Sequence, residues 1–357
     1  MGRPGARPGR APLPGVREDS LDMNDLGSIP DGGIGRDVTR RLRSDAEGVA
    51  EAARLIRSGR VVGFPTETVY GLGADATDAE AVARIFAAKE RPHFNPLIAH
   101  LADREAALTE GVFDDAASRL AGAFWPGPLT LVVPASSGCQ VCDLARAGLP
   151  SVALRVPGNA LARDLLAQVA RPVAAPSANR SGRVSPTCAD HVVGDLAGRI
   201  AAVLDGGETA VGVESTVVAC LDGRVRLLRP GGITRAALVD CLGFTLAEAV
   251  ETARPIGPGL LASHYAPRAR VRLDATAVRA GEAVLLFGSD EPQGMEAARA
   301  QLNLSPAGDL TEAATRLFSA LRRLDVTGAE TIAVVPMPET GLGEAINDRL
   351  RRAAAPR

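Results

Sequence analysis

The sequence predicts an α/β protein with two folded domains, of which the first is the larger. Short apolar runs of strand length alternate with stretches at helical spacing, a pattern typical of a sheet covered by helices. The length of 357 residues fits about two domains. Hydrophobic residues make up 46% of the chain and aromatic residues only 3%. The cores are therefore expected to consist mainly of Ala, Val and Leu.

The first domain is expected to run from about Ser44 to Gly243, as an α/β domain with an extended, twisted sheet. Its apolar runs have the length and composition of buried strands, and helical patterns separate several of them. The runs are Val61–Phe64, Leu129–Val133, Val152–Val156, Val173–Ala175, Ala201–Leu204, Thr216–Leu221 and Val225–Leu228.

A helix is predicted after the first of these strands. Thr77 and Glu80 have the spacing of a capping box, and apolar residues follow at helical spacing, with Lys89 at the end of the core-facing stripe. Lys89, Arg91 and Asn95 therefore leave a buried scaffold together. A cationic cluster where strand and helix ends meet is a natural anion site, although Lys and Arg at a helix end are more often solvated.

Two other segments flank this domain. Residues 1–43 are rich in Arg, Pro and Gly and are expected to be disordered, because they cannot bury enough apolar area to offset their ordering entropy. Residues 244–270 contain several Pro and Gly residues and are interpreted as an ordered linker.

The second domain is expected to span residues 271–357 as a small α/β unit with a parallel sheet. Ala283–Phe287 and Thr331–Val335 have the pattern of buried strands, whereas Leu310–Leu324 and Gly343–Ala354 have the pattern of amphipathic helices.

The overall composition limits the possible functions. A net charge of −2 gives no strong basic field, so strong direct binding to nucleic acid is not expected. No segment is apolar enough to span a membrane, and the N-terminus lacks the apolar region of a secretory signal. The five scattered cysteines fit a reducing, cytoplasmic setting. Cys139 and Cys142 form a lone C-x-x-C without further ligands, so we expect ordinary loop thiols and no metal site.

A series of motifs, in order, resembles the threonylcarbamoyl-AMP synthases in their longer, two-domain form, from about Asp45 to the C-terminus. The motifs are PTETVYGLG, KERPHFNPL, WPGPLTLV, SVALRVP, PSANRSGRVSPT, GVESTVV, LRPGGIT, HYAP and GLGEAINDRLRRAA. The resemblance implies a YrdC-like first domain, whose twisted mixed sheet surrounds a large cavity, and a small Rossmann-like C-terminal domain. It also implies that the linker folds over the cavity as a lid.

The resemblance implies a reaction as well. L-threonine, bicarbonate or CO2, and ATP would form threonylcarbamoyl-AMP and pyrophosphate, with Mg²⁺ accompanying ATP. The product would pass to a tRNA threonylcarbamoyltransferase complex that makes N6-threonylcarbamoyladenosine at tRNA position 37. The substrates supply both nucleophiles, so no enzyme nucleophile is expected. In agreement, the sequence has no G-x-S-x-G, H-E-x-x-H or Walker motif.

Five positions are implied as contacts of L-threonine. They are Thr68, His100, Arg155, Ala175 and Ser215. On the residues alone, His100 is more often a satisfied core histidine than a ligand group. Arg155 interrupts an apolar strand, so it is either an edge arginine in solvent or a bidentate fork for a carboxylate.

Nine positions are implied as contacts of ATP. They are Lys89, Arg91, Asn95, Ser151, Ser177, Asn179, Ser185, Arg229 and Tyr265. Lys89 and Arg91 would act by position and charge. His264 and Tyr265 lie in the linker, and Tyr265 is the residue that would contact the nucleotide when the linker closes as a lid.

Two other functions remain open on the sequence. One is a related carbamoyl-adenylate carbamoyltransferase, although such enzymes carry zinc-finger domains and no paired C-x-x-C spacing occurs here. The other is a non-catalytic RNA-binding module. The near-neutral charge and the lack of basic runs with interleaved aromatic residues argue against it.

Overall fold

The computed structural model describes residues 38–91, 95–248 and 264–356, which belong to one compact unit. The strands of the larger sheet are β1 (Arg40–Leu42), β2 (Val62–Phe64), β3 (Gly71–Asp75), β4 (Ile98–His100), β5 (Leu129–Pro134), β6 (Ser151–Arg155), β7 (Val173–Ala174), β8 (Ala202–Leu204), β9 (Thr216–Leu221), β10 (Arg224–Arg229) and β11 (Ala247–Glu248). The helices of the same domain are α1 (Ala46–Arg57), α2 (Ala79–Lys89), α3 (Arg104–Glu110), α4 (Asp115–Phe124), α5 (Asp143–Arg146), α6 (Ala160–Val169), α7 (Ala189–Leu196) and α8 (Arg235–Leu242).

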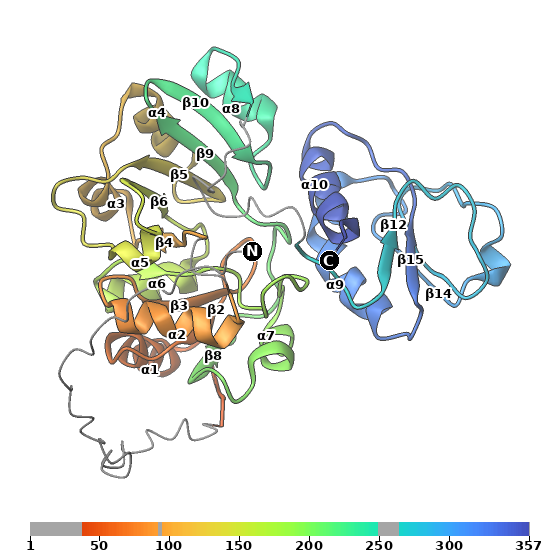
Figure 1. The fold of residues 1–357 in the computed structure, drawn as a ribbon, viewed down its shortest axis with the longest axis horizontal. Coiled ribbons are helices and arrows are strands. Elements are labelled where there is room, and N and C mark those ends of the chain that lie inside the picture. Colours follow the sequence, from red (N-terminus) through yellow and green to blue (C-terminus); the bar gives the residue numbers. More distant parts are fainter. Residues whose placement is uncertain (1–37, 92–94, 249–263, 357) are drawn as a thin grey trace, which may run out of the picture. The chain divides into compact units, whose positions relative to one another are not determined.

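The larger sheet is mixed, as the resemblance implied (Figure 1). Its strand order is β1-β8-β2-β3-β7-β4-β6-β5-β9-β10-β11. Strand β4 runs parallel to β6 but antiparallel to β7, and β9 runs parallel to β5 but antiparallel to β10. Segments far apart in the sequence therefore become neighbours, and their ends carry the polar residues described below.

Apolar side chains cover both faces of this sheet. Val61 and Val62 point to opposite faces, and each belongs to a different buried cluster. The cluster around Val62 also contains the apolar sides of α1 and α6, which pack against each other. The clusters consist mostly of Ala, Val and Leu, as the composition predicted.

The helix predicted before Lys89 is present, but its predicted N-terminal cap is wrong. Asp78 is the N-cap of α2, since its carboxylate accepts a hydrogen bond from the Glu80 backbone N–H at 2.8 Å. Thr77 instead donates its hydroxyl to Asp75 at 2.7 Å. An aspartate one residue later offers the same kind of acceptor with a full charge at the positive end of the helix dipole, so it replaces Thr77 as the cap.

The second domain is a small α/β unit with a parallel sheet, as predicted. Its elements are β12 (Arg270–Arg272), β13 (Ala283–Leu286), the short 3-10 helix η1 (Met295–Ala297), β14 (Ala300–Asn303), α9 (Leu310–Asp325), β15 (Thr331–Val334) and α10 (Leu342–Ala354). The strand order is β12-β15-β13-β14. Helices α9 and α10 pack against each other and against this sheet (Figure 1).

Some predicted boundaries need correction. The predicted end of the disordered extension, at residue 43, lies too far along the chain. Arg40–Leu42 form strand β1, which pairs in parallel with β8. The rest of that prediction, residues 1–37, lies outside the described residues. Most of the predicted linker and lid, residues 249–263, also lies outside them. In the described part of the chain, no helix is both long enough and apolar enough to cross a bilayer.

Candidate active site

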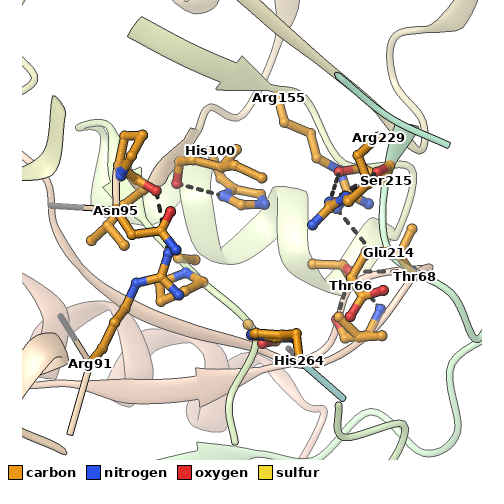
Figure 2. A pocket seen from close by; sticks show the side chains of 18 of the residues that line it. Thr66, Thr68, Arg91, Asn95, His100, Arg155, Glu214, Ser215, Arg229 and His264 are labelled. Carbon is orange, nitrogen blue, oxygen red and sulfur yellow. Dashed lines mark hydrogen bonds between the residues drawn. The ribbon is translucent and has the colours of Figure 1, made fainter. Parts of the chain in front are cut away.

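The larger domain carries a cavity with an empty volume of about 620 Å³, including the part open to solvent. The predicted residues that line it are Thr68, Arg91, Asn95, His100, Arg155, Ala175, Ser177, Ser215, Arg229 and Tyr265. They include all five residues implied for threonine and five of the nine implied for ATP. Figure 2 shows Arg91 and Asn95 on one side and Arg155, Arg229 and Ser215 on the other.

Strand pairing brings these side chains together. His100 ends β4 and Arg155 ends β6, and the two are register partners in the parallel pair. Thr68 lies in the turn between the antiparallel strands β2 and β3. Ser215 directly precedes β9, and Arg229 ends its antiparallel neighbour β10.

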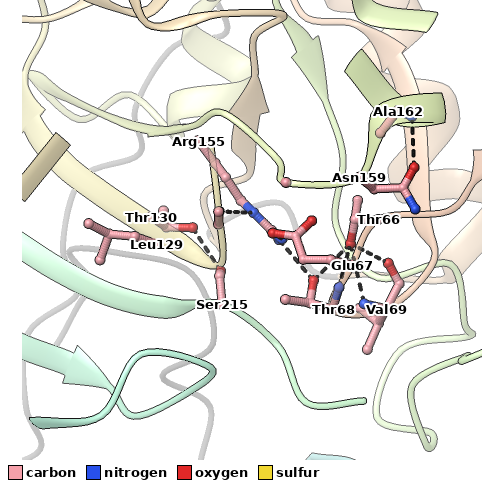
Figure 3. A network of polar contacts seen from close by, with 12 residues as sticks. Thr66, Glu67, Thr68, Val69, Leu129, Thr130, Arg155, Asn159, Ala162 and Ser215 are labelled. Carbon is pink, nitrogen blue, oxygen red and sulfur yellow. Dashed lines mark hydrogen bonds and ion pairs between the residues drawn. The ribbon is translucent and has the colours of Figure 1, made fainter. Parts of the chain in front are cut away.

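Arg155 is buried in a central strand, so the interpretation as an edge arginine in solvent is wrong. Its side chain is only 4% exposed and forms an ion pair of 2.8 Å with Glu67. It also donates a hydrogen bond of 3.0 Å to the Thr68 hydroxyl (Figure 3). Burial raises the pKa of Glu67, but the Arg155 guanidinium outweighs burial and holds that pKa below its usual value. Arg155 therefore presents a fixed, charged fork at the cavity wall.

His100 is a neutral wall residue. Burial, together with the nearby Arg155, lowers the pKa of His100 to about 3. Its ring lies edge-on to Phe64, with 6.2 Å between ring centroids, and its Nδ1 lies 3.3 Å from the Ile98 carbonyl oxygen. The two predicted roles, core histidine and ligand contact, are compatible here, because the ring is both buried and part of the cavity lining.

Arg91 and Arg229 are buried cations without a carboxylate partner among the described residues. Arg229 donates to the Ser215 carbonyl oxygen at 2.9 Å and to its hydroxyl at 3.2 Å. Among the described residues, the Arg91 guanidinium reaches only the Pro96 carbonyl oxygen, at 3.5 Å, and its Nε has no partner there. Burial lowers the pKa of Arg91 to about 10, so it remains charged at neutral pH. Two such buried arginines concentrate positive charge at one cavity, a feature that is typical of anion sites.

Two family models match the chain. A model described as telomere recombination matches residues 54–231, and one described as the threonylcarbamoyl-AMP synthase C-terminal domain matches residues 233–355. A threonylcarbamoyl-AMP synthase from Bacillus subtilis is 40% identical and covers 90% of this chain and 97% of its own length. The chain belongs to the threonylcarbamoyl-AMP synthase family.

Relatives from Pyrococcus abyssi are similar to this chain both in sequence and in structure. A threonylcarbamoyl-AMP synthase from Pyrococcus abyssi is 41% identical over 89% of this chain and 97% of its own length. The crystal structure of P. abyssi Sua5 complexed with L-threonine superimposes with a TM-score of 0.80 at 37% identity, covering 89% of this chain and 97% of that one. The similarity therefore spans both domains.

Lys89 lies outside the cavity lining, which does not support the predicted direct contact with ATP. Its ammonium donates to the carbonyl oxygens of Ser177 and Asn179, both at 2.5 Å, and the residue is 1% exposed. Burial and the nearby Arg91 lower the pKa of Lys89 well below its usual value. In this arrangement Lys89 holds the Ser/Asn-rich loop from behind, in contrast to Arg91, which faces the cavity.

Three other residues predicted for ATP also lie outside the lining. Asn179 donates its amide to the carbonyl oxygens of Arg180 and Arg183, at 2.9 and 2.7 Å, and so shapes the same loop. Ser185 donates to Glu214 at 2.5 Å, and Ser151 is buried at the start of β6. These three residues thus support the cavity wall from behind and do not line the cavity.

Two acidic residues at the site were not predicted. Glu67 pairs with Arg155, and Glu214 lines the cavity and pairs with Arg349 of α10. Both lie inside motifs of the family resemblance, PTETVYGLG and GVESTVV, so the sequence did contain a signal for them. Nothing in the sequence pattern connected Arg349 with Glu214, which lies 135 residues away.

Tyr265, the residue predicted to contact the nucleotide, lines the cavity and is anchored by the second domain. Its ring stacks on Phe318 of α9, with 5.5 Å between centroids and 27° between planes. It has a left-handed backbone conformation with φ of 62°. The end of the linker is therefore fixed against both the cavity and the C-terminal helices.

Proposed function

We propose that this protein is a nucleotidyltransferase that forms L-threonylcarbamoyladenylate and pyrophosphate from L-threonine, bicarbonate or CO2, and ATP. The observation that carries the proposal is the distribution of charge in the cavity. The cavity holds an arginine fork, Arg155, that is paired with Glu67, and also two cations without a carboxylate partner among the described residues, Arg91 and Arg229. An amino acid and a polyphosphate need different anion sites of this kind.

The side with Arg155 suits the amino acid. The carboxylate of L-threonine would accept two parallel hydrogen bonds from the guanidinium. The Thr68 and Ser215 hydroxyls offer partners for the small polar side chain, and His100 and Ala175 limit its size. The P. abyssi relative was crystallised in complex with L-threonine, which supports L-threonine as a ligand.

Arg91, Arg229 and Asn95 would bind the nucleotide phosphates, and Ser177 and Tyr265 would contact the rest of the nucleotide. We propose that Mg²⁺ enters with ATP as part of the substrate. Mg²⁺ keeps most of its waters and binds phosphate oxygens, so it needs few protein ligands. The described residues contain no group of three or more His, Cys, Asp or Glu side chains that could hold a metal ion.

The chemistry needs position and charge more than reactive side chains. The neutral threonine amine attacks CO2 and releases one proton to solvent, which gives a carbamate. A carbamate oxygen then displaces pyrophosphate from the α-phosphate of ATP. Arg91 and Arg229 would stabilise the negative charge on the phosphates during this step. The buried walls would keep water from the adenylate, which is a reactive anhydride. We further propose a cytoplasmic location and transfer of the product to the tRNA-modifying complex.

The test is a reconstituted reaction. Purified protein is incubated with ATP, L-threonine, bicarbonate and Mg²⁺, and pyrophosphate and the adenylate are measured, the latter by mass spectrometry. Pyrophosphate release should require threonine, bicarbonate and the divalent cation. Equal release without threonine would refute the assignment. Salt-dependent RNA binding with no ATP consumption would favour the RNA-binding alternative.

A further inference from the structure

Glu214 is an unusual residue for the wall of a cavity that is proposed to bind phosphates. It lines the cavity beside Ser215, Arg229 and Tyr265, and its side chain is 8% exposed. Glu214 and Arg229 are close enough for each to influence the pKa of the other. An unpaired carboxylate in this position would repel a phosphate. It would also be the natural ion-pair partner of Arg229 and would neutralise it.

Arg349 prevents this arrangement. The guanidinium of this α10 residue donates to one Glu214 oxygen at 2.7 Å, and the Ser185 hydroxyl donates to the other at 2.5 Å. Both Glu214 oxygens therefore have partners that are not Arg229. Burial raises the pKa of Glu214, but Arg349 and Arg229 outweigh burial, so Glu214 stays ionised at neutral pH.

The position of Arg349 is defined by several buried contacts. Its side chain is fully buried and also pairs with Asp348 at 2.5 Å. The guanidinium carbon lies 5.2 Å from the centre of the Tyr265 ring, as in a cation–π contact. One terminal nitrogen, Nη2, has no hydrogen-bond partner in the described part of the chain. Arg349 thus contacts two residues of the cavity lining, although it is not itself part of that lining.

Stability alone is a poor explanation for this arrangement. Removing two charges from water costs several kcal/mol per ion, and apolar residues of similar volume often serve a buried core as well or better. The ion pair between Arg349 and Glu214 does keep the charge of Glu214 apart from that of Arg229. Glu214 is balanced by the second domain, and Arg229 keeps hydrogen bonds only to the uncharged Ser215 oxygens among the described residues.

We propose that Arg349 is a positioning residue for nucleotide binding, which keeps Glu214 from neutralising Arg229 and so leaves Arg229 available for phosphate. The second domain would then complete the nucleotide site of the first domain through one buried side chain. This inference rests on the proposed function, because it assumes that Arg229 faces the phosphates of ATP.

The experiment compares the full-length parent protein with Arg349→Met, Glu214→Gln and the double variant. Arg349→Met should weaken ATP binding by about 10- to 100-fold, measured by isothermal titration calorimetry with MgATP, because Glu214 becomes free to pair with Arg229. The double variant should restore the ATP dissociation constant to within about threefold of the parent, since a glutamine cannot neutralise Arg229. Glu214→Gln alone should bind ATP at least as well as the parent.

Arg351→Ala is the matched control, because Arg351 lies on the same helix but is 57% exposed and pairs with Glu339 at the surface. It should leave ATP binding unchanged. Melting curves of all variants distinguish an effect on ATP affinity through the charge of Glu214 from an effect on folding stability. If Arg349→Met matters only for folding, its melting temperature falls, but the folded protein at low temperature binds ATP normally.

The outcomes distinguish this inference from the proposed function. No ATP binding by the parent would refute the nucleotide assignment and this inference with it. Normal ATP binding by the parent and by folded Arg349→Met would overturn this inference alone. A folded double variant that fails to recover ATP binding would also overturn it, because the effect of Arg349 would then not pass through the charge of Glu214.

Discussion

Arg155→Ala should affect threonine binding and folding stability by separate routes. The guanidinium binds Glu67 at 2.8 Å and the Thr68 hydroxyl at 3.0 Å, in a site where the Glu67 side chain is only 14% exposed. Loss of Arg155 leaves Glu67 buried without a counterion, and breaking such a pair costs about 3–5 kcal/mol of stability. Loss of the charged partner of a ligand carboxylate costs ~2–5 kcal/mol, or roughly 30-fold to several-thousand-fold in threonine affinity.

A second substitution separates these two effects. In Arg155→Ala with Glu67→Gln, the buried charge is gone, so urea unfolding should recover much of the lost stability. Threonine affinity, measured by calorimetry, should stay low because the fork is still missing. Arg155→Lys should recover binding only in part, since an ammonium cannot make two parallel hydrogen bonds. Normal threonine affinity in Arg155→Ala would refute the carboxylate role. Recovery of threonine affinity in the double variant would show that Arg155 only balances Glu67.

Three other changes test the walls of the cavity. Lys89→Met leaves two buried carbonyl oxygens without their donor and should cost ~1–3 kcal/mol or more of stability in urea unfolding; unchanged stability would contradict its supporting role. Gly231→Ala would place a Cβ 2.3 Å from the Glu214 carbonyl oxygen and 2.4 Å from the Thr216 nitrogen. Threonine affinity and stability should therefore both fall, the stability by ~1–3 kcal/mol. Threonine affinity and stability equal to those of the parent would show that the backbone at this cavity wall shifts to accept the methyl group. The pKa of His100 is about 3 in the folded protein and ~6.5 in the unfolded chain, so the unfolded state binds more protons between these pH values. The free energy of unfolding should therefore fall as pH drops through this window, by about 2 kcal/mol at pH 5. His100→Gln should remove this part of the pH dependence, and an unchanged dependence of the unfolding free energy on pH would show that another group causes it.

The sequence predicts the fold well where the apolar pattern is strong. The runs around Val132, Val152 and Val217 form β5, β6 and β9, within one or two residues of the predicted bounds. Strand β3 was not predicted, because Gly71–Asp75 contains two glycines and no β-branched residue. Strand β1 was missed because Arg40–Leu42 follows a segment of low apolar content and is defined by pairing with β8.

The site was predictable only in part, for a similar reason. Family motifs identified the residues of the cavity wall, but a motif does not say whether a cation faces the cavity or supports it from behind. Lys89 and Arg91 are two residues apart, yet Lys89 binds backbone carbonyls and Arg91 faces the cavity. The pairing of Arg349 with Glu214 depends on the packing of the second domain, which no local pattern records.

The arrangement of the buried arginines explains how a chain of net charge −2 could bind a polyanion. A weak overall field gives little long-range attraction, so binding must come from a few desolvated cations. Glu67 balances Arg155 and Glu214 balances Arg349, whereas no carboxylate of the described residues forms an ion pair with Arg91 or Arg229. A balanced pair suits a zwitterion such as threonine, which has no net charge to neutralise. The two unbalanced arginines suit phosphates, whose binding would relieve the cost of burying two like charges in one cavity.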